Sequence, residues 1–190
     1  MNCPKCNRFI ETIWSFCPYC GMENGSNFFI DSRDGERYRT VQIGNQIWMA
    51  ENLRYQCDGS HPYKEKSEFI KKYGLLYSRS ASRIVAPDGW HLPSYDEFKQ
   101  LEQFVGDVNQ LKKSGFWEKT WNDPYGFGAL PAGYSAQGVH FGLGTYTSYW
   151  TSSGNDFYHQ GSFFEIGRFN YDECGDVYPD SISIRLIKDT

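Results

Sequence analysis

The sequence lacks long apolar runs and clusters of positive charge, and these two absences exclude large classes of function. No apolar stretch approaches the ~18 residues that a membrane-spanning helix needs, and the mean hydropathy is −0.62. Lys and Arg number 19 against 23 Asp and Glu, so the net charge is −4, without the basic stripe that nucleic acids require. We therefore expect neither a membrane nor a nucleic acid as partner.

Histidine motifs and a secretion signal are also missing. The 4 histidines form no H-x-x-H or H-E-x-x-H set. Met1–Pro4 has neither the basic flank nor the apolar stretch of a secretion signal, which predicts a cytoplasmic protein. His91, which follows Trp90, is interpreted as a hydrogen-bonded core residue and not as a catalyst.

Cysteine, in contrast, is concentrated at the N-terminus. Two C-P-x-C turns contain Cys3, Cys6, Cys17 and Cys20, and four thiolates in two such turns supply the tetrahedral sulfur shell that zinc prefers. The alternatives are two disulfides, which the missing secretion signal disfavours, and a rubredoxin-like iron site. Four cysteines leave no open position for water or substrate, so the sequence predicts one structural zinc ion.

The residues around these cysteines fit a short zinc ribbon, a family that the segment resembles. Asn7 and Gly21 follow the second cysteine of each turn, where a left-handed backbone is usual. The segment has few apolar residues, so the metal, worth roughly 10–16 kcal/mol in small zinc peptides, must hold it together. We predict a ribbon at 1–24, a linker at 25–27 and a second domain at 28–190.

The second domain is predicted around Ser94. Its hydroxyl and the carboxylate of Glu97 form an S-x-x-E capping box, so a helix should begin after Ser94 and end at Gly106. Pro93 ends a short buried strand at Trp90–Leu92. The helix has one apolar face, formed by Phe98, Leu101 and Val105, which needs a sheet to cover it.

Turn residues predict further strands before this helix. The stretch 31–36 contains Asp34-Gly35 and separates Phe28–Ile30 from Tyr38–Ile43, which indicates a hairpin. Gly44 and Asn45 form the next turn, and Gln46–Met49 continues as a strand.

Five ordered motifs give the second domain a family resemblance. They are the stretches 34–53, 73–77, 89–94, 129–134 and 149–153, with Gln46-Ile47-Trp48-Met49-Ala50-Glu51-Asn52-Leu53 and Gly89-Trp90-His91-Leu92-Pro93-Ser94 among them. Together they resemble the Fibrobacter succinogenes major paralogous domain family over residues 28–190. That family is similar to C-type-lectin-like and formylglycine-generating-enzyme-like folds. The resemblance implies an α+β domain with two helices, small twisted antiparallel sheets and long irregular loops, with the first helix near Tyr73–Arg83.

The chain departs from this family in its cysteines. Many members carry a cysteine pair at the positions of Ala86 and Leu186, and another cysteine that would pair with Cys57. Loss of these cross-links is consistent with a reducing cytoplasm. Cys57 and Cys174 are left unassigned; inert structural thiols or a redox role both remain open, although neither has a histidine or basic neighbour at motif spacing.

The region from Tyr134 to Tyr178 mixes aromatic residues with Ser, Asn, Asp and Gly, as antibody paratopes do. The alternative is that these rings fill a loop-rich core. We predict a protein-binding face within Tyr146–Tyr178, with Tyr158, Phe169 and Tyr171 as its anchors, because charged or flexible neighbours make those local segments poor core.

The functional prediction is a non-catalytic recognition protein that binds a protein partner. Trp121-Asn122-Asp123 is similar to a lectin calcium motif but stands at the wrong place in the chain, so it is interpreted as a loop turn. Cys174 is alone where formylglycine-generating chemistry needs a cysteine pair. The alternatives are a cryptic enzyme of the formylglycine-generating-enzyme-like fold and a retroelement-diversified or phage-type receptor.

Overall fold

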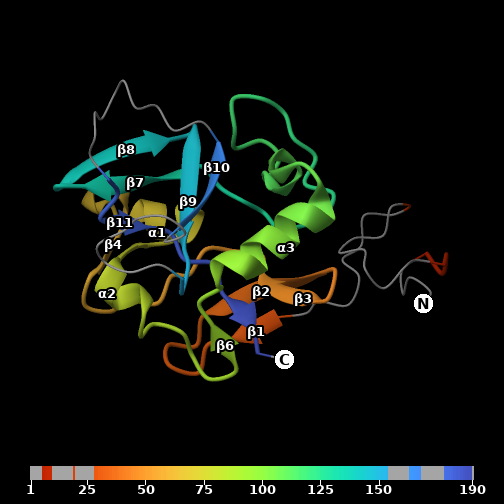
Figure 1. The fold of residues 1–190 in the computed structure, drawn as a ribbon, viewed down its shortest axis with the longest axis horizontal. Coiled ribbons are helices and arrows are strands. Elements are labelled where there is room, and N and C mark those ends of the chain that lie inside the picture. The colour runs from red at the N-terminus through yellow and green to blue at the C-terminus, as the bar shows by residue number, and fades with distance from the viewer. Residues whose placement is uncertain (1–5, 10–18, 20–27, 154–162, 168–177, 190) are drawn as a thin grey trace.

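The chain forms two β-sheets joined by short helices, which confirms the α+β class (Figure 1). A computed structural model describes residues 6–9, 19, 28–153, 163–167 and 178–189. Within these ranges, no helix has both the length and the apolar character needed to cross a membrane.

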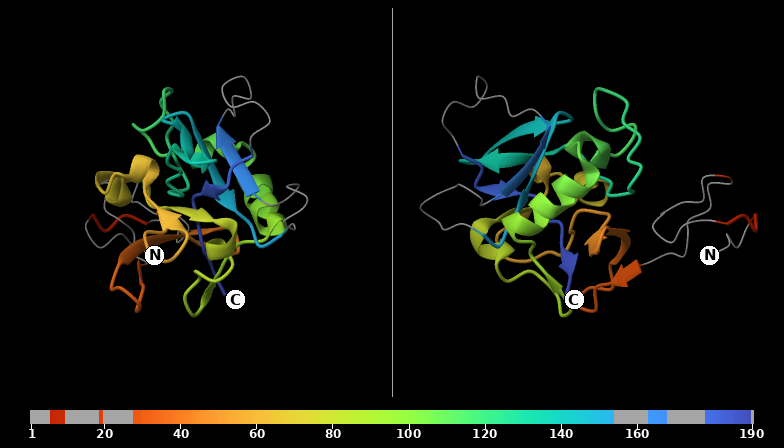
Figure 2. Two further views of the ribbon diagram at one scale, coloured as in Figure 1. Left: turned by 90° about the vertical axis from the view of Figure 1, so that its left-hand side faces the viewer. Right: turned by 45° about the vertical axis from the view of Figure 1, so that its right-hand side comes forward.

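The first sheet is antiparallel throughout and brings both ends of the second domain together. Its five strands lie in the order β1 (Phe28–Ile30), β2 (Arg37–Ile43), β3 (Gln46–Met49), β12 (Ile187–Lys188) and β6 (Trp90–His91). Figure 2 shows the last strand, β12 in blue, beside the orange strands from the beginning of the domain. The predicted hairpin and the strands at 46–49 and 90–91 are therefore confirmed.

The second sheet has seven strands and is mixed, because β7 and β9 run parallel while the other pairs are antiparallel. Six of its strands lie in the order β10 (Phe163–Gly167), β9 (Tyr146–Trp150), β7 (Ala132–Ala136), β11 (Ser181–Ile182), β5 (Leu76–Ser78) and β4 (Ser60–His61), and β8 (Val139–Leu143) pairs with β7.

The helices are short and lie between strands. They are the α-helices α1 (Glu68–Tyr73), α2 (Arg79–Ser82) and α3 (Tyr95–Val105), with 3-10 turns at η1 (Tyr63–Glu65) and η2 (Val108–Leu111). The segment 112–131 has no helix and only an isolated bridge between Lys112 and Ala129, so it forms a long irregular connection.

Helix α3 begins and ends as the sequence predicted. The hydroxyl of Ser94 accepts from the backbone N–H of Glu97 at 3.2 Å, and the Ser94 N–H donates to the Glu97 carboxylate at 2.7 Å. Gly106 terminates the helix with a φ of 75°, a conformation that favours glycine. The three residues of the predicted apolar face, Phe98, Leu101 and Val105, are all buried.

Phe98 is the point at which α3 joins the two sheets. Its ring stacks on Phe164 of β10 at 4.6 Å between centroids and packs against Trp48 of β3 at 4.9 Å. The apolar face of α3 is therefore covered by both sheets, as the prediction that it packs on a sheet requires. One part of the core forms around this contact.

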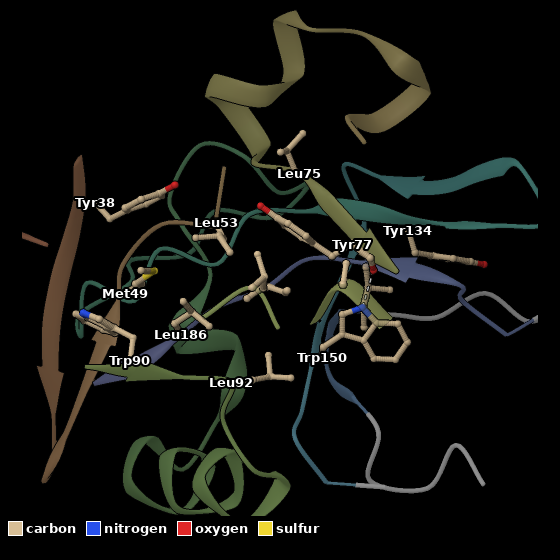
Figure 3. Close-up of a cluster of buried hydrophobic side chains, with 14 of the residues drawn as sticks. Tyr38, Met49, Leu53, Leu75, Tyr77, Trp90, Leu92, Tyr134, Trp150 and Leu186 are labelled. Atoms are coloured by element: carbon tan, nitrogen blue, oxygen red, sulfur yellow. Dashed lines mark hydrogen bonds between the residues drawn. The ribbon is translucent and has the colours of Figure 1, made fainter. Parts of the chain in front are cut away.

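A second part of the core lies between the first sheet, including β6, and strands β5 and β9 of the second sheet (Figure 3). Trp90 is only 8% exposed and packs its ring against Phe29 at 5.0 Å. Trp150 donates its indole N–H to the carbonyl of Tyr77 at 2.6 Å, so this ring has its polar atom satisfied inside the core.

The prediction of one helix near Tyr73–Arg83 is wrong in the middle of that stretch. α1 ends at Tyr73 and α2 begins at Arg79, and Leu76–Ser78 forms strand β5 between them. Gly74 ends α1 with a φ of 84°, and a Cβ there would lie 2.6 Å from the Cβ of Asn52. This close contact, together with the buried run that follows Gly74, places the segment in the second sheet instead of a continuous helix.

Candidate functional site

Most of the predicted zinc ligands lie outside the described residues. This holds for Cys3, Cys17 and Cys20, whereas Cys6 is described and partly buried. Asn7 has a φ of 56°, the left-handed conformation that the sequence predicted after the second cysteine of a C-P-x-C turn. The backbone at this turn is thus compatible with a metal-binding turn, while zinc binding itself stays a prediction.

The aromatic segment divides between core and undescribed residues. Tyr146, Tyr149 and Phe164 are buried in the core, so they do not form part of a binding face. Tyr178 is 56% exposed. The three predicted anchors, Tyr158, Phe169 and Tyr171, lie outside the described residues, and the binding face that they would form stays a prediction.

An open cleft of about 880 Å³ lies at one end of the first sheet. Three segments that are separate in the sequence line it: 34–37 at the β1–β2 turn, 51–56 after β3, and 67–71 at α1. Its lining is mostly polar and contains no histidine or cysteine.

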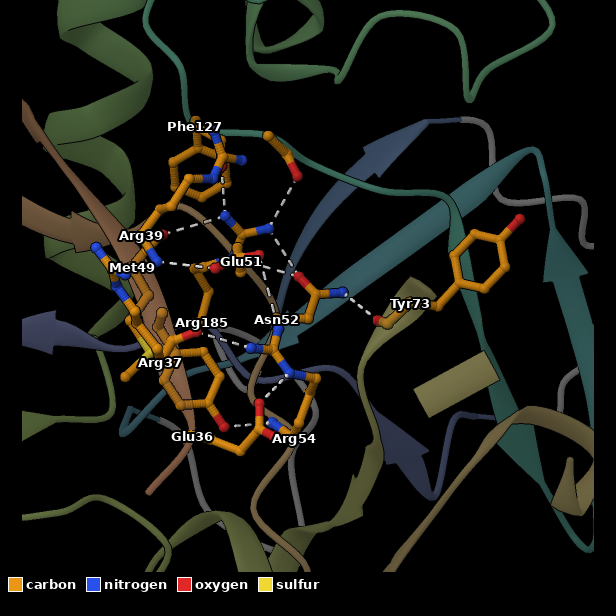
Figure 4. Close-up of polar contacts among 12 residues, drawn as sticks. Glu36, Arg37, Arg39, Met49, Glu51, Asn52, Arg54, Tyr73, Phe127 and Arg185 are labelled. Atoms are coloured by element: carbon orange, nitrogen blue, oxygen red, sulfur yellow. Dashed lines mark hydrogen bonds and ion pairs between the residues drawn. The ribbon is translucent and has the colours of Figure 1, made fainter. Parts of the chain in front are cut away.

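Several contacts hold the side chain of Arg54 in this cleft (Figure 4). It donates to the carboxylate of Glu36 and to the carbonyl of Arg37, both at 3.0 Å. Its guanidinium also lies 3.7 Å from the carboxylate of Glu51 and 4.4 Å from the ring centroid of Tyr38. A guanidinium with contacts on several sides has few alternative rotamers, so the cleft wall is fixed before any ligand arrives.

Tyr38 forms the floor beneath Arg54. It is fully buried, and its hydroxyl accepts the backbone N–H of Arg54 at 3.0 Å. Burial raises the pKa of this phenol, and the hydrogen bond from Arg54 only partly opposes the shift. Tyr38 therefore stays neutral and acts as a positioning residue for Arg54.

A second arginine supports the neighbouring wall. Arg33 donates to both carboxylate oxygens of Asp31, at 2.8 and 2.6 Å, and stacks 3.8 Å from the ring centroid of Tyr55, which lines the cleft. Burial raises the pKa of Asp31, but the hydrogen bonds from Arg33 outweigh it, so the pKa is lowered overall. Asp31 is thus ionised and holds Arg33 in place.

Arg185 fills the interior behind the cleft, and sequence reasoning missed it. It is fully buried and donates to Asn52 at 2.7 Å and to the carbonyls of Met49 and Gly128, each at 3.1 Å (Figure 4). Asn52 in turn donates to the carbonyl of Tyr73 at the end of α1. The only sequence signal was an arginine inside the apolar run before β12.

Asp123 lies inside the loop that the sequence interpreted as a turn. One carboxylate oxygen accepts from the Gly128 N–H at 2.8 Å, and the other is buried without a hydrogen-bond partner. Burial raises the pKa of Asp123 to about 6, although the Gly128 N–H and the charge of Arg185 act in the opposite direction. The inward-facing carboxylate is consistent with a turn and not with a lectin-type calcium site.

This pKa makes stability depend on pH. The pKa of Asp123 in the folded state lies above the value of about 3.9 in the unfolded state, so the folded state binds a proton at Asp123 more tightly. The stability of the fold therefore falls as the pH rises from about 4 to about 6. Asp123→Asn keeps an acceptor for Gly128 and removes the charge, so the free energy of unfolding should rise by about 1–3 kcal/mol at pH 7.5 and stay nearly unchanged at pH 4.

Urea denaturation at the two pH values measures this effect. Asp88→Asn, at an exposed turn, is the matched control and should change the free energy of unfolding by no more than about 0.5 kcal/mol at either pH. An equal loss of stability for Asp123→Asn at both pH values would mean that the carboxylate is ionised in the folded state at every pH tested.

His91 is hydrogen-bonded as predicted, but it is not a core residue. Its side chain is 41% exposed, and its two ring nitrogens lie 2.6 Å from Asp189 and 3.0 Å from Glu97. Burial lowers the pKa of His91, but the bonds to the two carboxylates outweigh it and raise the pKa overall. The ring therefore links the N-terminus of α3 to the end of β12.

Cys57 is partly buried, packs against the core and is not part of a disulfide. Its backbone N–H donates to the hydroxyl of Ser60 at 2.9 Å, so the residue forms part of the turn before β4. This environment supports the interpretation of Cys57 as a structural thiol. Cys174 lies outside the described residues.

Comparison with known proteins identifies one family. The family described as the Fibrobacter succinogenes major domain matches residues 41–188, which is most of the chain and includes two of the three segments of the cleft. No curated protein and no solved structure matches the chain.

Proposed function

The chain belongs to the Fibrobacter succinogenes major domain family, and from this premise we propose that it is a non-catalytic recognition protein that binds a protein partner. The observation that carries the proposal is the balanced charge of the cleft. Three carboxylates and three cationic groups line one open hollow, namely Asp34, Glu36, Glu51, Arg37, Arg54 and Lys71.

This balance selects a class of ligand. A lining with both signs of charge attracts neither a polyanion nor an apolar small molecule, whose sites are mostly hydrophobic. It complements a polypeptide segment that presents acidic and basic side chains together. The fixed position of Arg54 lowers the entropy cost of ordering the cleft on binding.

The predicted aromatic anchors Tyr158, Phe169 and Tyr171 belong to the same proposal as a second contact face. The proposal also includes a C-type-lectin-like architecture for the second domain, which the pair of small sheets and the irregular connection at 112–131 support. The N-terminal segment is proposed to be a zinc ribbon with one structural zinc ion on its four cysteines, supported by the left-handed Asn7.

Charge reversal tests the cleft. Glu36→Lys and Lys71→Glu change exposed side chains and should leave the fold intact. A partner captured from native cell lysate and identified by mass spectrometry should bind each variant at least about 10-fold more weakly, since charge repulsion replaces attraction at the contact. Biolayer interferometry with the purified partner measures the change.

Matched controls reverse charges on other exposed surfaces. Asp88→Lys and Lys119→Glu should bind the partner as the unmodified protein does. Unchanged binding by both cleft variants would remove the cleft from the proposal. Loss of binding by a variant with Tyr158, Phe169 and Tyr171 all replaced by Ala, with both cleft variants unaffected, would assign recognition to the aromatic face instead.

A further inference from the structure

Two histidines and a glutamate that are distant in the sequence converge beside β4 and β8. His61 ends β4, Glu65 ends η1, and His140 lies in β8. One ligand atom from each lies within 4.8 Å of the others. The Nδ1 atom of His61 is 3.3 Å from the Glu65 carboxylate, and the centroids of the two imidazole rings are 5.4 Å apart.

His140 contains a buried polar atom that the protein does not satisfy. Its Nε2 atom is buried and has no hydrogen-bond partner. Tyr63 packs against the same ring with 5.0 Å between centroids. A buried nitrogen without a partner destabilises the folded state, and it is unusual enough to require an explanation such as an ion.

The backbone of η1 turns Glu65 toward this ring pair. Lys64 and Glu65 have φ values of 52° and 54°, so two consecutive residues other than glycine adopt the left-handed region. That conformation is unfavourable for such residues and tends to occur at functional sites. Here the Glu65 carboxylate lies 3.3 Å from His61 although the side chain remains exposed to solvent.

We propose that His61, Glu65 and His140 form a binding site for a divalent transition-metal ion of the zinc class. Two imidazoles and one carboxylate are ligands that zinc accepts at about 2.0–2.2 Å, whereas calcium and magnesium prefer oxygen ligands alone. Ligand atoms around a tetrahedral zinc ion are about 3.4 Å apart. Side-chain rotations that bring the atoms closer by no more than about 1.4 Å would therefore place all three ligand atoms around one ion.

The site is open to solvent on one side. Glu65 is exposed, while His61 and His140 are half-buried, so three protein ligands leave a fourth position for water or for an atom of a ligand. This distinguishes the site from the proposed four-cysteine zinc site, which is closed. The two sites share no residue with each other or with the cleft, so each proposal succeeds or fails alone.

Metal counting on the full-length protein tests the proposal. The protein is stripped with a chelator, dialysed against Zn²⁺ and analysed by elemental analysis. The protein with Cys3, Cys6, Cys17 and Cys20 all replaced by Ser should still bind one equivalent of zinc. The further replacement His140→Phe should remove that equivalent. Because outer-shell changes alone weaken metal binding by 10–100-fold, removal of a ligand should weaken it by more than about 100-fold.

His140→Phe separates a metal site from a structural role. Phenylalanine keeps a ring against Tyr63 and removes the unsatisfied nitrogen, so the melting temperature without metal should stay the same or rise. In the Cys3/Cys6/Cys17/Cys20→Ser background, Zn²⁺ at about 100 times the dissociation constant should raise the melting temperature by about 5–10 °C, and addition of His140→Phe should abolish the shift. His91→Ala is the control, since His91 is bound to Asp189 and Glu97 elsewhere, and should retain the shift.

Co²⁺ substitution identifies the ligands. In the Cys→Ser background, bound Co²⁺ should show weak visible bands without the intense thiolate charge-transfer absorption, and His61→Ala should abolish them. Retention of the cysteine-independent equivalent by His140→Phe would overturn the proposal. So would the absence of any metal beyond the four-cysteine site in unmodified protein.

Discussion

Replacing Arg185 with methionine should lower the free energy of unfolding by about 3–5 kcal/mol, as expected when one member of a buried charged network is removed. Arg185 is fully buried and donates to Met49, Asn52, Phe127 and Gly128. Methionine has a similar volume but no donor, so all of these acceptors would be left buried without their partner.

The positions of these acceptors explain why Arg185→Met should destabilise the whole domain. Met49 is the last residue of β3 and Asn52 follows shortly after it, whereas the carbonyls of Phe127 and Gly128 belong to the irregular connection that precedes β7. Among the described residues, no sheet hydrogen bond holds residues 127 and 128, so the guanidinium ties this connection to the first sheet together with the packing of Phe127 against Trp48 of β3. Arg185→Lys should also be destabilising, because one ammonium cannot reproduce the planar arrangement of five donors.

Urea denaturation measures the cost, and Arg54→Met is the matched control. Arg54 also makes several hydrogen bonds, but it lies at a cleft wall where water can replace them, so its loss should cost about 1 kcal/mol. Equal costs at the two positions would show that the Arg185 acceptors find other partners.

The features that the sequence predicted best are those encoded within a few neighbouring residues. The capping box of Ser94 and Glu97 needs only residues three apart, and the hairpin turn at Asp34-Gly35 needs only its own backbone preferences. Asn7 is a further case, because its φ follows from its place after the second cysteine of a turn.

The features that it missed depend on contacts between distant segments. Leu76–Ser78 resembled part of a helix until the close approach of Gly74 to Asn52 and the pairing with β4 and β11 made it a strand. The sequence left open whether the aromatic residues from Tyr146 onward form a binding face or a core, and Tyr146 and Tyr149 belong to the core because both faces of β9 are buried. A period-2 pattern cannot distinguish a solvent-facing side from one covered by α3 or by loops.

The candidate sites were hidden for the same reason. The cleft is assembled from three separate segments, and the motif at 34–53, which contributes to two of them, indicated a family and a hairpin but no binding site. His61 and His140 are 79 positions apart, since 140 − 61 = 79, and they meet only because β4 and β8 flank η1 in the folded chain. A search for histidine spacing can detect ligands on one helix or turn, but not a pair brought together by the sheet.

Trp90→Ala should destabilise the protein by about 3–5 kcal/mol, and Ser94→Ala by only about 1 kcal/mol. Trp90 is 8% exposed and lies in the core beside Phe29 and Leu186, so alanine leaves a cavity that the surrounding strands cannot fill (Figure 3). Ser94 contributes one capping hydroxyl at the edge of the same core.

The structure explains why loss of that hydroxyl is tolerated. The backbone N–H of residue 94 still donates to the Glu97 carboxylate at 2.7 Å, and His91 holds the other carboxylate oxygen at 3.0 Å, so Glu97 keeps its position in Ser94→Ala. The helix loses the bond to its N3 amide and the hydrogen bond from the Ser94 hydroxyl to the Glu97 carboxylate at 2.9 Å, but it loses no packing. Denaturant midpoints of the two variants give the ranking, with Ser94→Thr, which keeps a capping hydroxyl, as the control. A larger loss for Ser94→Ala than for Trp90→Ala would mean that the N-terminus of α3, and not the indole of Trp90, anchors the first sheet to the rest of the domain.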